Sequence, residues 1–175
     1  MKTILRDLIE HHIWANETLL TYCEGLTPEQ LALAVPGTFG GTEATLVHIA
    51  LNEEHYLGLI DRGGVPTGIT TTILSGEVPR ELASVRPVLA RTAAAWRELV
   101  DRHPDNRLLD VEWEGEMHHL PLSDIVTQVV EHGAEHRTHI RTTLAAHGVA
   151  HDIDEGTTEP DLSVWAWQEA RESAS

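Results

Sequence analysis

Apolar residues that recur every three or four positions place the strongest constraint on how this chain can fold. This spacing puts the apolar side chains on one side of an α-helix, so each such stretch predicts an amphipathic helix. Glycine or proline near the ends of these stretches marks where the helices stop. The predicted long helices cover residues 4–24, 42–60 and 84–102, with a fourth that Pro121 and Ser123 open and Gly148 ends. We therefore expect an all-α fold, a four-helix bundle.

Local signals refine these helices. Residues 27–30, Thr-Pro-Glu-Gln, have the form of a capping box with proline at the first helical position, which predicts a short helical turn to about Leu33. The following PGTFGG segment, residues 36–41, breaks it. Thr42 is expected to cap the second long helix. Pro87 is expected in the first turn of the third, where proline is tolerated.

A different pattern precedes the fourth long helix. Leu109, Val111 and Trp113 alternate with polar residues, and Glu114-Gly115 can form a turn. Residues 107–120 are therefore predicted to form a small β-hairpin before the last long helix. Residues 61–79 are rich in Gly, Thr and Pro, which predicts a long surface connection of the kind that borders binding sites.

Length and charge limit the function classes. The 175 residues fit a single domain, 1–175, with residues 152–175 as a C-terminal tail and short helix. A net charge of −16 would repel a phosphate backbone, so we expect no nucleic-acid partner. No stretch approaches the roughly 20 apolar residues of a membrane span, and the first residues do not resemble a signal peptide. We expect a soluble cytoplasmic protein with no membrane partner.

Histidines supply the main chemical signal. His132 and His136 stand four residues apart in the fourth helix, so both imidazoles project from one face, toward the apolar side. His48, at the edge of the second helix's apolar stripe, can complete a site with three nitrogen ligands. The chain has 12 histidines, however, so the pair also fits chance, and His48 alone fits a core or rim residue. Spacing leaves both interpretations open.

Several neighbouring residues are candidates for a substrate pocket. Asn52, one helical turn after His48, either lines the same cavity or faces water. His139 is expected at the rim of the site, and Trp165 at the pocket edge, in a short segment that begins at residue 161. We assign His11 and His12 to packing and surface.

No convincing catalytic nucleophile is found. The only cysteine, Cys23, falls in the apolar stripe of the first helix, where a thiol behaves as a small hydrophobe. A single cysteine also excludes a site built from several thiolates. Any metal must therefore rely on histidine, carboxylate or water.

Three fragments carry a resemblance that covers nearly the whole chain: HHIWANETLL, TLVHIALNEEHYL and LSDIVTQVVEHGAEHRTHIRTTL. They are similar to the DinB-like (damage-inducible DinB/YfiT) family. The resemblance implies a four-helix bundle with crossover connections and a divalent metal bound by one histidine from the second long helix and a His-x-x-x-His-Arg motif from a later one. The matching positions here are His48, His132, His136 and Arg137.

The resemblance also implies a class of function. Members of the family include thiol-dependent transferases and isomerases that use bacillithiol or mycothiol. We therefore expect a divalent-metal-dependent enzyme, a thiol-dependent S-transferase or a related transferase, isomerase or hydrolase, with a small-molecule substrate, a low-molecular-weight thiol as cosubstrate, and a homodimeric assembly. Zinc or nickel is the expected ion, with iron or manganese as alternatives.

One departure and two alternative functions remain. The family's frequent Gly-Gln after the arginine is replaced by Thr138-His139, which leaves the pocket beside the metal unassigned. The first alternative is a non-catalytic protein that binds a metal or a small molecule with the same histidines. The second is a purely structural interaction module, for which no stoichiometric metal is expected.

Overall fold

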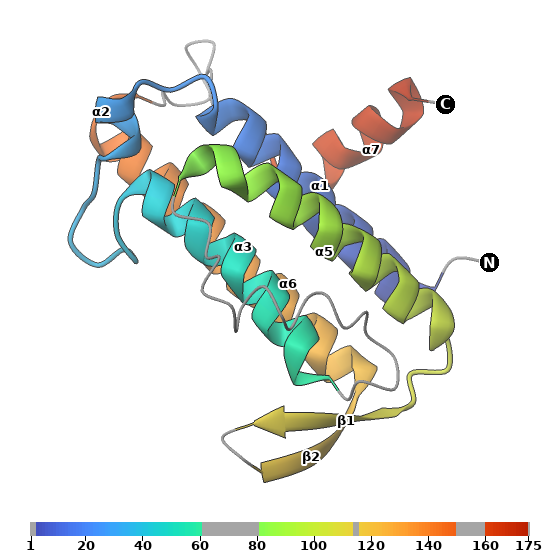
Figure 1. The fold of residues 1–175 in the computed structure, drawn as a ribbon. Coiled ribbons are helices and arrows are strands. Elements are labelled where there is room, and N and C mark those ends of the chain that lie inside the picture. Colours follow the sequence, from blue (N-terminus) through green and yellow to red (C-terminus); the bar gives the residue numbers. More distant parts are fainter. Residues whose placement is uncertain (1–2, 61–80, 114–115, 150–159, 175) are drawn as a thin grey trace.

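The computed structural model describes residues 3–60, 81–113, 116–149 and 160–174. Its four long helices pack side by side as a bundle (Figure 1): α1 (Ile4–Cys23), α3 (Thr42–Leu59), α5 (Leu82–Arg102) and α6 (Leu122–Ala146). Helices α1 and α3 each pack against both α5 and α6, so α1 lies diagonally opposite α3. Helices α1 and α6 run in one direction and α3 and α5 in the other (Figure 1). The predicted four-helix bundle is confirmed.

A two-stranded antiparallel sheet lies next to one end of the bundle. Strand β1 (Leu108–Trp113) pairs with β2 (Glu116–Pro121), and α6 follows β2 directly. Leu109 and Val111 are buried against the core, and Val111 also forms a bridge with Ile60 at the end of α3. The predicted hairpin is confirmed; its turn, residues 114–115, lies outside the described residues.

The two short helices both begin with a side-chain cap, of which the sequence predicted the first. Helix α2 (Pro28–Leu31) has the full capping box, because the Thr27 hydroxyl accepts the Gln30 N–H and the Gln30 side chain accepts the Thr27 N–H. Helix α7 (Val164–Ser173) is capped by the Ser163 side chain. It packs on α1 and leaves the body of the bundle (Figure 1).

Two predicted helix starts were wrong. The N-cap of α3 is Gly41, and Thr42 is its first helical residue, with a buried hydroxyl that has no hydrogen-bond partner among the described residues. Helix α5 begins at Leu82, two residues before the predicted start, because the Glu43 carboxylate accepts the Leu82 N–H at 2.9 Å. Pro87 therefore lies inside α5, beyond its first turn. This cap comes from another helix, so local sequence does not reveal it.

The predicted surface connection at residues 61–79 lies outside the described residues. Among the described helices, none has the length and apolar content that crossing a membrane requires. The other ends agree closely with prediction: α1 ends at Cys23, α3 at Leu59 and α6 at Ala146, followed by Gly148 with a φ of +68°.

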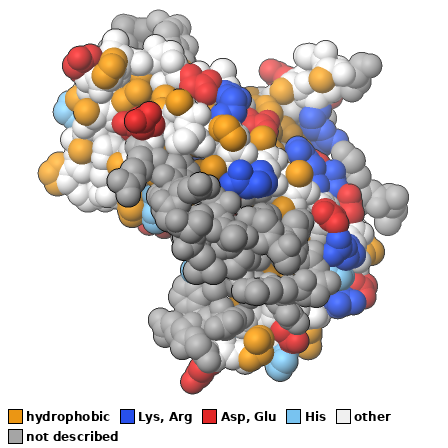
Figure 2. Space-filling view, in the orientation of Figure 1, with side chains coloured by type: hydrophobic (Ala, Val, Ile, Leu, Met, Phe, Trp, Pro, Cys, Tyr) orange, Lys and Arg blue, Asp and Glu red, His pale blue; other side chains and the backbone are white. Residues whose placement is uncertain are grey.

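Ion pairs join α1 and α5 at the surface. Figure 2 shows acidic and basic side chains interspersed over the face that these two helices form. Arg97 lies 2.9 Å from Glu10, and Arg86 lies 2.6 Å from Glu24. Ion pairs that remain partly in contact with solvent contribute about 0–1 kcal/mol each. Apolar burial therefore dominates the stability of the bundle.

A buried polar layer divides the apolar core into two clusters. Ile13, Trp96 and Val129 belong to the cluster beside the hairpin, whereas Leu19 and Ile140 belong to the cluster at the other end. Asn16, Glu53 and Arg137 lie between the two clusters along their helices, and His12 lies one turn before Asn16; none of the four is more than 6% exposed. A polar layer at this depth must satisfy its own hydrogen bonds.

Candidate metal centre

The three histidines proposed from the sequence lie on the seam between α3 and α6. His48 occupies the second turn of α3, and His132 and His136 lie one turn apart in the middle of α6. Positions four apart share one side of a helix, and α6 turns this side toward α3. Helix packing thus brings together residues that are more than 80 positions apart in the sequence.

The imidazole nitrogens of these residues converge. One ring nitrogen from each of the three lies within 4.8 Å of the others, and the Nε2 atoms of His48 and His132 are 3.2 Å apart. Ring centroids are 4.4 Å apart for His132 and His136 and 4.6 Å apart for His48 and His136. Nitrogens about 2.0–2.1 Å from a tetrahedral zinc ion are separated by about 3.3 Å. The separation of the His48 and His132 nitrogens is already close to this value, and the His136 nitrogen lies within 4.8 Å of both.

The three imidazoles are unprotonated at neutral pH. Burial, followed by the nearby His136, lowers the pKa of His48 to about 4. Burial and the neighbouring histidines also lower the pKa of His132 to about 4, although the negative charge of Glu53 acts in the opposite direction. The pKa of His136 is lowered by burial and then by His139. Neutral imidazoles keep the lone pairs that a metal ion requires.

Two predicted pocket residues contact the histidine cluster. The side-chain nitrogen of Asn52 lies 3.1 Å from the imidazole nitrogens of His48 and donates to the carbonyl oxygen of His48 at 3.0 Å. His139 lies one turn after His136, with their Nδ1 atoms 3.3 Å apart. Asn52 and His139 therefore flank the cluster, on α3 and on α6.

Trp165, the third predicted pocket residue, is placed elsewhere. It lies on α7, its side chain is 74% exposed, and α7 packs on α1. His11 and Trp167 connect these two helices, with ring centroids 5.4 Å apart. Among the described residues, no ring contact joins Trp165 to the histidines of the seam. Its role at a pocket stays a prediction without structural support.

Two aromatic residues that the sequence did not single out flank the cluster. Phe39 stacks on His48, with centroids 3.8 Å apart and an interplanar angle of 24°, and meets His136 in a T-shaped contact with centroids 5.2 Å apart. Tyr56 meets His132 with centroids 5.7 Å apart. Phe39 belongs to the loop before α3, where no periodic pattern marks a residue as part of a site.

A second group of polar residues, which we call the central network, consists of His12, Asn16, Glu53, Trp96 and Arg137. His12 Nε2 lies 2.5 Å from Glu53 Oε1, a contact that crosses the bundle diagonal from α1 to α3. Trp96 Nε1 donates to Glu53 Oε2 at 2.6 Å, and Arg137 Nη1 donates to Asn16 Oδ1 at 2.6 Å.

The sequence contains a pattern that indicates this network. The assignment of His12 to packing and surface did not use this pattern. His12 and Glu53 both fall within the apolar stripes of their helices. A polar side chain in an apolar stripe requires a buried partner. Here each of the two is the partner of the other.

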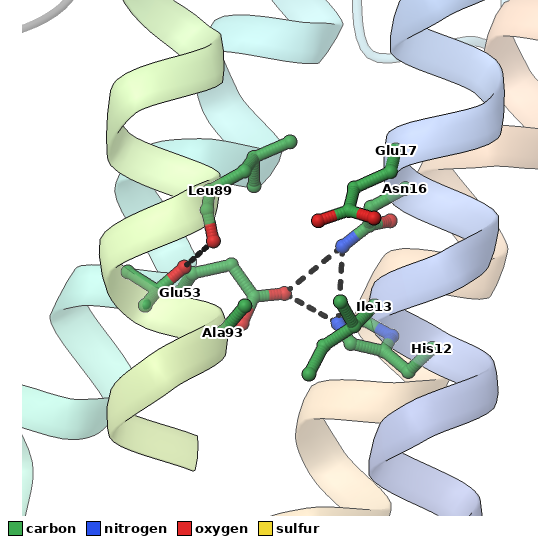
Figure 3. A pocket seen from close by; sticks show the side chains of 8 residues that line it. His12, Ile13, Asn16, Glu17, Glu53, Leu89 and Ala93 are labelled. Carbon is green, nitrogen blue, oxygen red and sulfur yellow. Dashed lines mark hydrogen bonds and ion pairs between the residues drawn. The ribbon is translucent and has the colours of Figure 1, made fainter. Parts of the chain in front are cut away.

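A small cavity reaches the central network from the α1–α5 side (Figure 3). His12 and Asn16 project into it from α1, and the Glu53 carboxylate points toward both of them from α3. Its volume of about 10 Å³ leaves room for about one water molecule. This cavity is too small for an organic substrate.

The sequence profile of the DinB family matches residues 1–171. The chain belongs to the DinB family. No curated protein matches the sequence. Family membership agrees with the resemblance carried by the histidine motifs, and the clustered histidines of this DinB-family protein are compatible with metal binding.

The donor set fits a divalent ion. His48, His132 and His136 offer three neutral nitrogens, and imidazole suits late first-row metals such as zinc and nickel. Glu131 and Glu135, the carboxylates nearest in sequence on α6, are exposed and do not belong to the cluster. The residues present can therefore hold a metal as a site of three histidines, but their assignment as ligands remains a prediction.

Proposed function

We propose that this DinB-family protein is a divalent-metal-dependent enzyme that transfers a low-molecular-weight thiol to an electrophilic small molecule. His48, His132 and His136 hold the ion, with zinc or nickel preferred over iron or manganese. The observation that carries this proposal is the convergence of three unprotonated imidazole nitrogens at one point between α3 and α6. We extend the proposal to a cytoplasmic protein and to a homodimeric assembly, the second of which the family resemblance implies.

The bound ion supplies a double positive charge that three neutral imidazoles leave uncompensated, and this charge lowers the pKa of a thiol or water molecule beside it. The protein's own residues bind and orient. Asn52 donates to the backbone carbonyl of His48, and its side-chain nitrogen lies 3.1 Å from the ring nitrogens of His48, so it packs beside that imidazole and limits its rotation. Phe39 and Tyr56 provide aromatic surface on either side of the histidines, suited to an apolar part of a substrate.

Cys23 does not act as the nucleophile in this proposal. Its side chain is fully buried in the apolar cluster at the α2 end of the bundle. Burial raises the pKa of its thiol to about 12, so the reactive thiolate is scarce at neutral pH. The nucleophile is therefore an exogenous thiol, or water in a related hydrolase.

The first test measures metal content. Untagged protein is loaded with zinc or nickel, desalted and analysed for bound metal, alongside H48A and the control H119A, which changes an exposed histidine of the hairpin. We expect one ion per chain in the wild type and in H119A, and loss of the ion in H48A. Full occupancy and full turnover in H48A would refute the proposal.

The second test separates catalysis from binding. The loaded protein is incubated with cysteine-containing thiols and a panel of small electrophiles, and consumption of the thiol is followed with and without enzyme. Turnover that H48A lacks and H119A retains supports the transferase. Stoichiometric metal without turnover on any pair would instead support the alternative, a protein that binds metal or a small molecule without catalysis.

A further inference from the structure

We propose that the buried negative charge of Glu53, which does not itself contact the ion, strengthens the binding of a divalent cation by the three histidines. Arg137 opposes this effect, and the balance between the two charges sets the metal affinity. This inference rests on the proposed function, because it requires that the histidines bind a metal.

The Glu53 carboxylate is held rigidly at the centre of the bundle. It is 4% exposed, and each of its oxygens has at least one nitrogen partner. Oε1 lies 2.5 Å from His12 Nε2 and 3.3 Å from Asn16 Nδ2, and Oε2 accepts from Trp96 Nε1 at 2.6 Å. The contacts come from α1 and α5, so the position of this charge depends on three helices.

Glu53 is connected through His12 to α6, the helix that carries two of the three histidines. His12, which Glu53 holds, packs on the α6 backbone at Gly133, next to His132. A Cβ atom at Gly133 would lie only 2.4 Å from His12 Cε1, so the imidazole can approach α6 this closely only because residue 133 is glycine. Glu53 also lies on α3, five positions after His48, and its charge acts on His132.

Electrostatics then give the direction of the effect. Three neutral ligands leave the double charge of a divalent ion without local compensation, and charges in a buried region interact more strongly than in water. Within the described part of the chain, Glu53 is the carboxylate of the buried layer that adjoins the histidines. Its attraction for the cation lowers the free energy of the bound state.

Arg137 supplies the opposing charge. It is 6% exposed, donates to Asn16 Oδ1, and lies 3.4 Å from His12 Nδ1. Its charge interacts with that of Glu53. Removal of Glu53 leaves the Arg137 guanidinium, one residue after His136 in the sequence, as an unbalanced buried cation, whereas removal of Arg137 leaves the Glu53 carboxylate as an unbalanced buried anion. The two changes must therefore move the metal affinity in opposite directions.

The chain offers a matched control one residue away. Glu54 lies on the same helix, is 0% exposed, and pairs with an arginine, Arg91 of α5. Its contact is on the α3–α5 seam, whereas the histidines occupy the α3–α6 seam. E54Q therefore reproduces the loss of a buried, paired carboxylate without altering the charge next to His132.

The experiment measures the zinc affinity of the full chain by competition with a chromophoric chelator at pH 8. The variants are E53Q, E54Q, R137M and the double variant E53Q/R137M, with folding checked by circular dichroism. We expect E53Q to bind zinc on the order of 10-fold to 100-fold more weakly than the wild type, the range found for residues that support metal ligands. E54Q should bind as the wild type does, R137M more tightly, and the double variant between the two single ones.

A merely structural role gives a different order. If the network only held the helices in place, both single variants would bind zinc more weakly and the double variant most weakly. That order, or equal affinities of E53Q and E54Q, would overturn the inference. If E53Q does not fold, R137M decides alone. A zinc affinity of R137M equal to or below that of the wild type would contradict the charge balance. A wild type that binds no more zinc than H48A would instead overturn the proposed function, and the inference with it.

Discussion

The two polar clusters of this bundle differ in how their atoms are satisfied. In the central network, nitrogen and oxygen atoms pair with one another, and its five members come from all four long helices. In the histidine cluster, ring nitrogens face other ring nitrogens: Nε2 of His48 and Nε2 of His132 lie 3.2 Å apart, and no carboxylate belongs to the cluster among the described residues. The first arrangement is complete without a ligand, whereas the second is suited to receiving one.

We infer from this difference that the central network contributes to the free energy of folding, whereas the histidine cluster contributes to the free energy of cation binding. A closed, buried network contributes to folding, because losing one member leaves its partner desolvated and unpaired. A cluster of lone pairs in which His48 and His132 are half-buried contributes little to folding and instead provides binding energy for a cation. The predictions that follow test this separation.

The largest expected effect comes from H12A in metal-free protein. This change leaves the buried Glu53 without its partner across the bundle, and loss of one partner of a buried pair costs about 3–5 kcal/mol. H48A, at a half-buried position, should cost about 1 kcal/mol or less. Urea denaturation in the presence of a chelator measures both. Equal losses in the two variants would show that the clusters are not energetically distinct.

The second effect is stabilisation by metal. Zinc at about 100 times its Kd should raise the free energy of unfolding by about 2.7 kcal/mol, because it binds the folded chain in preference to the unfolded one. H136A should abolish this increase, since it removes one of the three nitrogens, and H119A should retain it. Thermal denaturation with and without zinc provides the measurement. An increase that persists in H136A would place the ion outside the histidine cluster.

The third effect concerns the close approach between α1 and α6. G133A places a methyl group 2.4 Å from His12 Cε1 and 2.8 Å from an Arg137 nitrogen, and hydrogen bonds hold both side chains in place. Overpacking outweighs the better helix propensity of alanine, so we expect a net loss of about 1–2 kcal/mol.

Gly25 provides the control for this substitution. A Cβ atom there would lie 3.4 Å from the nearest described atom, the Tyr22 carbonyl oxygen, which is an ordinary van der Waals contact. Urea denaturation of G133A and G25A gives the comparison. If G133A is as stable as G25A, His12 is free to move away, and the network is less rigid than its hydrogen bonds imply.

Local sequence predicted those features that depend on local physics. The C-terminal ends of α1 and α3 lie within one residue of the positions predicted from the apolar period and the stop signals. The capping box of α2 is present as expected. The start of α5 was missed because its cap comes from Glu43, 39 positions earlier in the chain. A cap supplied by another helix depends on packing, which periodicity does not encode.

The site shows the same division. The spacing of His132 and His136 predicted their shared face, whereas the family resemblance strengthened the choice of His48 as their neighbour. The apolar stripes contained His12 and Glu53, but their pairing depends on α1 and α3 lying diagonally opposite each other, which becomes visible only in the assembled bundle. Phe39 lies in a loop, and its stacking on His48 follows from the path of that loop.

The smallest expected effect is a pH dependence confined to the histidine cluster. His48 and His132 have folded-state pKa values of about 4, below the ordinary value of about 6.5 expected in the unfolded chain. Between these two values the unfolded chain binds more protons, so the stability of metal-free protein should fall as the pH falls from 6.5 toward 4. Partial exposure of both rings weakens this dependence. H48A should show a shallower fall than the wild type or H119A in urea denaturation at several pH values. Parallel curves for H48A and the wild type would mean that the cluster is protonated as readily as free histidine, and therefore that its lone pairs are not held ready for a cation.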